Sequence, residues 1–73
     1  SALAAGNDGL GDLRHLALAA CAHLKPGGTL LLEHGYDQAD AVRSLLRKNG
    51  IEHPESWADL AGIPRVSGGK VSE

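Results

Sequence analysis

The stretch LKPGGTLLLE, residues 24–33, decides the fold of this chain. Its proline disfavours helical geometry at Lys25, and the two glycines that follow permit a sharp reversal of the backbone. The next segment, Thr29–Glu33, is too short for a second helix. It is apolar without alternation, which is typical of a strand covered on both faces in a parallel α/β sheet. The stretch therefore predicts a helix that stops, reverses and continues as a strand.

The helix before this reversal is predicted over residues 10–24. Its proposed buried face consists of residues at helical spacing, namely Leu13, Leu16, Ala17, Ala20 and Leu24. Residues 1–9 are small and Gly-rich, which predicts a loop. We expect Asp8 or Asp12 to accept hydrogen bonds from the first free backbone N–H groups of this helix.

A second helix follows the predicted strand. Residues 34–36 form a tight connection, Asp37 is the expected N-cap, and the helix is expected to reach about Lys48. Asn49 and Gly50 then stop it, because glycine suits the left-handed position after a helix. The remainder predicts a terminal β-hairpin with strands at 55–59 and 65–67 and a turn at 60–64, followed by a fraying tail over 67–73.

Size and composition restrict the class of protein. The chain has 73 residues, a formal net charge of −2, one cysteine and two aromatic residues. It holds one domain at most, and such a small core is marginal by itself. A single cysteine excludes an internal disulfide and fits a reducing cytoplasm. The charge argues against a dedicated binder of nucleic acid or of an anionic membrane, and no stretch is long and apolar enough to span a bilayer. The opening residues do not resemble a signal peptide.

Three stretches carry a resemblance to a known family. The first is residues 24–32, LKPGGTLLL, which resemble the segment leading into the fifth strand of class I methyltransferases. The second is LEHG at residues 32–35, followed by Gln38 and Val42. The third is DLAG at residues 59–62, followed by Arg65. Together with the opening ALAAG and DGL, they resemble the release-factor glutamine methyltransferases of the PrmC/HemK family over nearly the whole chain.

The resemblance implies a fold and an activity for a parent protein. The implied fold is α/β, with residues 1–73 as the C-terminal half of a Rossmann-like class I methyltransferase sheet. The implied reaction transfers a methyl group from S-adenosylmethionine to the side-chain amide nitrogen of the Gln in the Gly-Gly-Gln motif of a peptide release factor, in the cytoplasm. The family's last strand runs antiparallel between the fifth and sixth strands. We therefore expect the strand around Arg65 to pair with both the 30–33 and the 55–58 segments.

The family's chemical motifs are missing from this sequence. It has no Asn-Pro-Pro-Tyr, and its Gly27-Gly28 pair follows a helix, whereas the family's cofactor-binding Gly-rich loop follows a strand. We expect the chain to begin downstream of the active-site motif. We assign it no catalytic, cofactor-binding or metal residue, and we expect it to be inactive and to bind no S-adenosylmethionine by itself.

Glu33 and His34 are the strongest candidate site residues, because they end a predicted strand where open α/β sheets bind ligands. A carboxylate beside an imidazole can move protons. The preferred interpretation is structural: both residues shape the turn and the wall of the pocket. His15, His23 and His53 are interpreted as surface or boundary residues, Cys21 as a packing residue, Arg65 as a structural partner of a carboxylate or carbonyl, and Arg43, Arg47 and Lys48 as a solvated face.

Two other functions stay open from the sequence. One is a different class I methyltransferase with a small-molecule or nucleic-acid substrate, which the upstream sequence would distinguish. The other is a non-enzymatic interaction module, which a cooperative melt of a monomeric chain would favour. We also expect the chain to self-associate, because residues 30–32 carry no proline or charge to guard a free strand edge.

Overall fold

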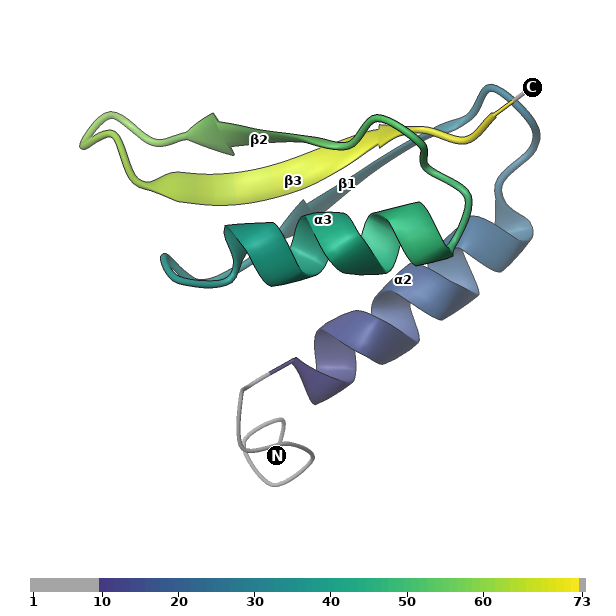
Figure 1. Cartoon of the computed structure of the whole chain (residues 1–73), viewed down its shortest axis with the longest axis horizontal. Helices are drawn as coiled ribbons and strands as arrows, with labels where there is room; N and C mark the ends of the chain where they lie inside the picture. The colour runs from purple at the N-terminus through teal and green to yellow at the C-terminus, as the bar shows by residue number, and fades with distance from the viewer. Residues whose placement is uncertain (1–9, 73) are drawn as a thin grey trace.

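The computed structural model describes residues 10–72, which form two layers. The element order is α2 (Gly11–His23), β1 (Thr29–Glu33), α3 (Ala39–Lys48), β2 (Glu55–Ala58) and β3 (Pro64–Lys70). Both helices lie on the same side of the sheet (Figure 1). The predicted helices and strands are all present, and the bounds of β1 are those that the sequence predicts.

The sheet has the strand order β1-β3-β2, with β3 antiparallel to both neighbours. Leu32 pairs with Ser67 on one side of β3, and Ser56 pairs with the same serine on the other side. The expected insertion of the last strand between its two partners is confirmed. Strands β1 and β2 run in the same direction, because each is antiparallel to β3.

The prediction of a fraying tail after Ser67 is wrong. Strand β3 continues to Lys70, and the Val71 N–H donates to the Gly28 carbonyl at 2.8 Å. Glycine at position 68 is required by a close approach, because a Cβ atom there would lie 2.0 Å from the Leu30 carbonyl oxygen. Gly68 therefore lies where β3 approaches β1 closely.

The core lies between the helices and the inner face of the sheet. Its buried members are Leu13, Ala17, Leu32, Val42, Leu46 and Ile51. Each Leu, Val or Ile side chain that is fully buried stabilises the fold by about 1.5–3 kcal/mol. Leu16, predicted to be buried on α2, is instead 54 % exposed, because α3 and β1 contact the helix along a narrower stripe.

Both predicted helix caps are wrong where the structure describes them. The N-cap of α2 is Leu10 with no side-chain cap bond, so Asp12 lies within the first turn, and Asp8 lies outside the described residues. The N-cap of α3 is Gln38, not Asp37. The side chain of Gln38 folds back, and its Oε1 accepts the Gly35 N–H at 2.7 Å. The predicted stop of α3 is confirmed, with Gly50 at φ +103°.

The β2–β3 turn covers residues 59–63, so the predicted turn is shifted by one residue. Asp59, which was expected in the strand, organises this turn. Its Oδ1 accepts hydrogen bonds from the N–H groups of Ala61 at 2.9 Å and of Ile63 at 3.0 Å. Pro64, expected in the turn, is the first residue of β3.

The outer face of the sheet is open in the described chain. Leu31 is 59 % exposed and Trp57 is 45 % exposed on this face. Burial along β1 alternates, with Leu32 buried toward the helices and Leu31 exposed away from them. The expectation that β1 is covered on both faces is therefore wrong for the described residues, because both described helices pack against one face (Figure 1).

Candidate functional site

The candidate site lies at the carboxyl end of β1, where the chain enters the turn to α3. The His34 N–H continues the ladder to β3 by donating to the Arg65 carbonyl at 2.9 Å. The pairing holds the start of the turn against β3, and the Gln38 side chain closes the turn from the other end. Open α/β sheets bind ligands at the carboxyl ends of their strands.

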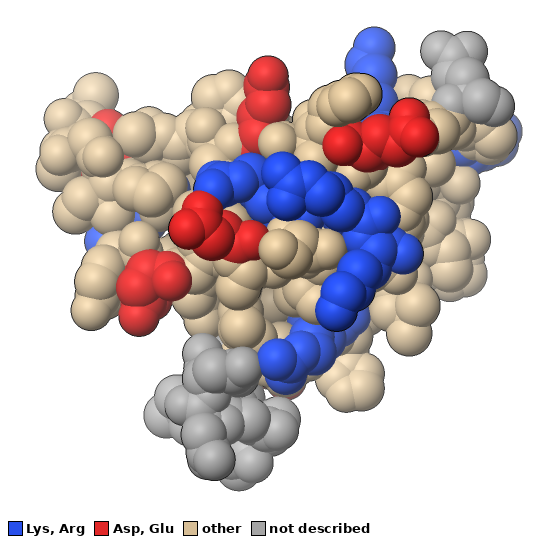
Figure 2. Space-filling view, in the orientation of Figure 1, with Lys and Arg blue, Asp and Glu red and all other residues tan. Residues whose placement is uncertain are grey.

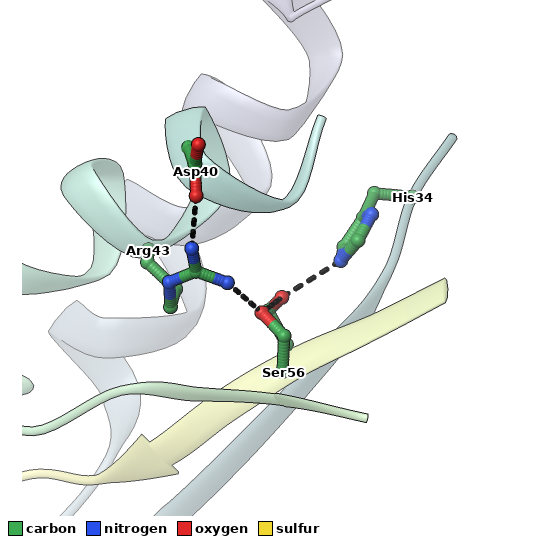
Figure 3. A network of polar contacts seen from close by, with 5 residues as sticks. His34, Asp40, Arg43 and Ser56 are labelled. Atoms are coloured by element: carbon green, nitrogen blue, oxygen red, sulfur yellow. Dashed lines mark hydrogen bonds and ion pairs between the residues drawn. The ribbon is translucent and has the colours of Figure 1, made fainter. Parts of the chain in front are cut away.

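A chain of polar side chains connects this turn to the hairpin and to α3 (Figure 3). His34 Nε2 lies 2.7 Å from the Oγ of Ser67, and that hydroxyl lies 2.6 Å from the Oγ of Ser56. Arg43 donates to Ser56 through Nη1 and contacts the Asp40 carboxylate through Nη2. These contacts join β1, β3, β2 and α3. We call the connected side chains of His34, Ser67, Ser56, Arg43 and Asp40 the polar relay.

The two ends of the polar relay fix the direction of its hydrogen bonds. At one end, His34 Nδ1 lies 2.9 Å from the Gly35 carbonyl, which can only accept, so Nδ1 carries the proton of the neutral ring. At the other end, the Arg43 guanidinium can only donate. Ser56 therefore accepts from Arg43 and donates to Ser67, and Ser67 donates to the unprotonated Nε2 of His34.

The Ser67–His34 contact resembles the nucleophile and base of a hydrolase, but the geometry excludes that chemistry here. Ser67 has no solvent-exposed surface, so a substrate cannot reach its hydroxyl. A catalytic base is oriented by a third group, often a carboxylate, whereas His34 Nδ1 faces its neighbour's carbonyl. The relay satisfies buried polar groups and holds four elements together, and no buried side-chain polar atom among the described residues lacks a partner.

A shallow cavity of about 240 Å³ adjoins the relay. Its walls come from the β1–α3 turn, the first turn of α3 and the start of β3, and are formed by Tyr36, Asp37, Ala39, Asp40, Arg43 and Pro64. Typical ligand pockets enclose roughly 300–1,000 Å³, so this cavity is a partial one. A larger hollow of about 510 Å³ lies at the opposite end of β1, beside Thr29, Trp57 and Lys70.

The structure separates the two candidate residues from the sequence. Glu33 is exposed and pairs with Val66, whereas the His34 ring reaches Ser67 on the inner face of the sheet. They therefore do not form a carboxylate–imidazole pair. Neither residue lines the 240 Å³ cavity, and their role as a pocket wall stays a prediction.

The structure also shows where Arg65, Cys21 and the three other histidines lie. Arg65 Nε lies 3.4 Å from Asp59 Oδ2, which confirms a structural contact to a carboxylate. Cys21 packs against the core, and its partial burial raises the pKa of the thiol. The surface assignment of the three remaining histidines is confirmed: His15, His23 and His53 are all exposed.

The basic residues of α3 are not all solvated. Lys and Arg side chains form a band across the face that carries α3 (Figure 2). Arg47 and Lys48 are exposed as predicted, but the Arg43 side chain is only 25 % exposed because its guanidinium joins the relay. Sequence reasoning missed Arg43, Ser56 and Ser67 as members of one site, since only the strand register brings them together.

Gly27 and Gly28 do not form a cofactor-binding loop for S-adenosylmethionine. The glycine pair at 27–28 turns the chain between a helix and a strand, and its backbone donors are engaged. The Gly27 N–H donates to Val71 at 3.0 Å, and the Gly28 N–H donates to Lys25 at 2.8 Å. Within residues 10–72, no three His, Cys, Asp or Glu side chains gather as metal ligands. No helix among them is long and apolar enough to cross a membrane.

Comparison with curated proteins places this small α/β chain among methyltransferases. It is 54 % identical over 70 residues to the release factor glutamine methyltransferase of Burkholderia pseudomallei, covering 96 % of this chain and 25 % of that protein. The proteins of the same name from Bordetella pertussis and Pseudomonas aeruginosa are 52 % and 49 % identical, over 93 % and 96 % of this chain and 25 % of each relative. No family model matches the chain.

The chain belongs to the release factor glutamine methyltransferase family. It spans about a quarter of the length of the curated relatives it matches. The family resemblance drawn from residues 24–35 and 59–65 is thereby confirmed.

Proposed function

We propose that this chain is the C-terminal part of a class I methyltransferase domain, the end of its Rossmann-like sheet. The longer protein transfers a methyl group from S-adenosylmethionine to the side-chain amide nitrogen of the glutamine in the Gly-Gly-Gln motif of a peptide release factor, in the cytoplasm. One observation carries the proposal: about half of the residues are identical to release factor glutamine methyltransferases along nearly the whole chain.

The strand order supports this proposal. A terminal strand that runs antiparallel between its two neighbours is the arrangement that the resemblance implies, and β3 lies in this way between β1 and β2. The relation also gives a reason for the apolar run in β1. Leu31 faces open solvent in the described chain, which suits a strand that further parts of a larger fold cover.

The chain's contribution to the reaction is positional. The turn after β1 borders the carboxyl end of the sheet, and the polar relay holds His34 and therefore this turn in one place. Glu33 and His34 would stand at the wall of the glutamine pocket. A positioned wall aligns the amide for transfer without supplying a reacting group. No described residue is assigned a step of proton or methyl transfer.

The chain alone is proposed to be inactive and to bind no S-adenosylmethionine, because its glycine pair is engaged in the helix-to-strand turn. Titration calorimetry of the chain with S-adenosylmethionine should give no measurable heat of binding. Micromolar affinity would show that the cofactor site lies at least partly within this chain.

The sequence upstream of Ser1 in the encoding gene tests the reaction class. It should contain Asn-Pro-Pro-Tyr after a strand, preceded by a Gly-rich loop after an earlier strand. If the upstream sequence lacks Asn-Pro-Pro-Tyr, amide methylation fails as the proposal and another class I methyltransferase reaction replaces it.

A further inference from the structure

Arg43 is the residue through which the polar relay reaches α3. Its guanidinium donates to the Ser56 hydroxyl through Nη1 and contacts the Asp40 carboxylate through Nη2 (Figure 3). A guanidinium presents its donors in a rigid planar fork, so two partners in different directions hold it in one orientation. The Arg43 side chain therefore anchors the hydrogen bonds of the relay on the helix.

The relay continues from Arg43 into the interior of the fold. Ser56 and His34 are partly buried, and Ser67 between them has no solvent-exposed surface. Each hydroxyl accepts a hydrogen bond from the Arg43 side and donates one toward the His34 ring. Hydrogen bonds connected in this way polarise and orient one another. Removal of the guanidinium should therefore weaken the bonds that hold the ring.

The ring end of the relay fixes the turn after β1. His34 Nδ1 donates to the Gly35 carbonyl at 2.9 Å, and the Gly35 N–H donates to Gln38 Oε1 at 2.7 Å. The Gln38 N–H also donates to the Gly35 carbonyl, at 3.1 Å. Both polar backbone groups of Gly35 are thus bonded. A glycine is conformationally permissive, so these bonds determine the shape of the turn.

Arg43 also borders this turn without the help of the serines. It lines the 240 Å³ cavity together with Tyr36 and Asp37, which form the middle of the turn. The loss of its guanidinium would thus weaken the bonds at the start of the turn and remove part of a wall beside its middle. Two separate contacts of one side chain therefore converge on the same segment.

We propose that Arg43 is a positioning residue for methyl transfer: it holds the turn after β1 in the conformation that aligns the target amide, and it does not touch the substrate. This inference rests on the proposed function, in which the turn forms a wall of the glutamine pocket. Transfer rates depend steeply on alignment, and a misplacement of about 1 Å can slow a reaction by about a hundredfold. Because the bonds of the guanidinium lead to Asp40 and to the relay, affinity for S-adenosylmethionine should not depend on Arg43.

Single-turnover methylation by the full-length protein tests the proposal. The protein is saturated with S-adenosylmethionine and mixed with release factor at several concentrations, and mass spectrometry follows the Gly-Gly-Gln peptide. Arg43→Met keeps most of the side chain's bulk and removes its donors. It should lower the maximal rate by about ten- to hundredfold. The half-saturating concentration of release factor and the affinity for the cofactor should keep their wild-type values.

The matched control is Arg47→Met. Arg47 lies one turn further along the same helix and is exposed, so its loss should leave the maximal rate unchanged. Each rate is divided by the amount of S-adenosylmethionine that the preparation binds, which counts the folded molecules. A merely structural role of Arg43 would lower the melting temperature and leave this corrected rate unchanged.

A double-mutant cycle tests whether Arg43 acts through the relay. Ser56→Ala interrupts the relay at the next side chain and should also lower the corrected maximal rate. The double variant R43M/S56A should be no slower than the slower single variant, because residues in one hydrogen-bond network do not act additively. Independent roles would instead multiply the two losses.

Four results would overturn the proposal and leave the proposed function intact. They are a wild-type rate in Arg43→Met, an equal loss of rate in Arg47→Met, a parallel loss of cofactor affinity in Arg43→Met, and losses that multiply in the double variant. A folded wild-type protein that transfers no methyl group to the release factor would overturn the proposed function and this inference with it.

Discussion

The Nε2 atom of His34 lies 2.7 Å from the Oγ atom of Ser67, although the residues are 33 positions apart in the chain. The contact joins the first residue after β1 to the middle of β3. The Ser67 hydroxyl also forms a hydrogen bond with Ser56 on β2, and Ser56 accepts a hydrogen bond from Arg43 on α3. One line of hydrogen bonds thus fixes the turn that leaves β1 relative to the other three elements.

The direction of the polar relay predicts the tautomer of His34. At a pH where the ring is neutral, the proton should reside on Nδ1, because Gly35 offers only an acceptor and the hydroxyl of Ser67 donates to Nε2. Long-range ¹H–¹⁵N correlation spectra of the ring distinguish the two tautomers. A protonated Nε2 with a bare Nδ1 would show that the relay runs in the opposite direction.

Replacing Ser67 should destabilise the fold more than its small size suggests. Ser67→Ala leaves His34 Nε2 and the Ser56 hydroxyl without their shared partner. Unsatisfied buried groups cost about 1–3 kcal/mol in unfolding free energy, and since both residues are only partly buried we expect the lower end of this range. The matched control is Ser44→Ala on the exposed side of α3, expected within about 0.5 kcal/mol of wild type. Urea unfolding of the three chains measures both values, and equal stabilities would contradict a structural role for the relay.

Local signals predicted the backbone of this chain better than its side-chain contacts. The proline and glycines at 26–28 place the end of α2 and the start of β1, and Gly50 places the end of α3. These are effects of neighbouring residues on φ and ψ. The family resemblance, and not periodicity, supplied the order of the strands.

The features that sequence reasoning missed depend on distant contacts. Gly68 looks like a loop residue until Leu30 of the neighbouring strand occupies the space of its side chain. Arg43 looks like a solvated residue until the register of β2 brings Ser56 beneath it. The helix caps were missed for a local reason, since Gln38 satisfies the turn with its own side chain and leaves Asp37 without that role.

Gly68→Ala should be the most destabilising small substitution in the sheet. The new methyl group would lie 2.0 Å from the Leu30 carbonyl oxygen and 2.9 Å from Leu31 Cα, and neither backbone atom can move without separating β1 from β3. We expect a loss of about 3 kcal/mol in unfolding free energy, the upper end of the usual range for overpacking. Gly35→Ala is the control, because its methyl would meet only side-chain atoms, the nearest being Oε1 of the flexible Gln38 at 3.1 Å. A Gly68 variant as stable as this control would contradict the close strand approach.

Acid should loosen the β2–β3 turn through Asp59. The Ile63 N–H, followed by the Ala61 N–H and Arg65, holds the pKa of this carboxyl below its ordinary value of 3.8. The stabilisation from this group is therefore fully present above pH 3.8 and is lost as the pH falls through the lower folded-state pKa. The amide shifts of Ile63 and Ala61 should report this titration, and Asp59→Asn should abolish it. A titration midpoint at or above the ordinary value would refute the assignment.

Methyl transfer to a release factor tests the central claim most directly. The full-length protein that contains this chain is incubated with S-adenosylmethionine and a release factor, and mass spectrometry reads the Gly-Gly-Gln peptide. The account predicts one added methyl group on the glutamine side chain with the full-length protein, none with the chain Ser1–Glu73 alone, and none when the glutamine is replaced by alanine. An unmodified glutamine with a folded full-length protein, or methylation by Ser1–Glu73 alone, would contradict the account.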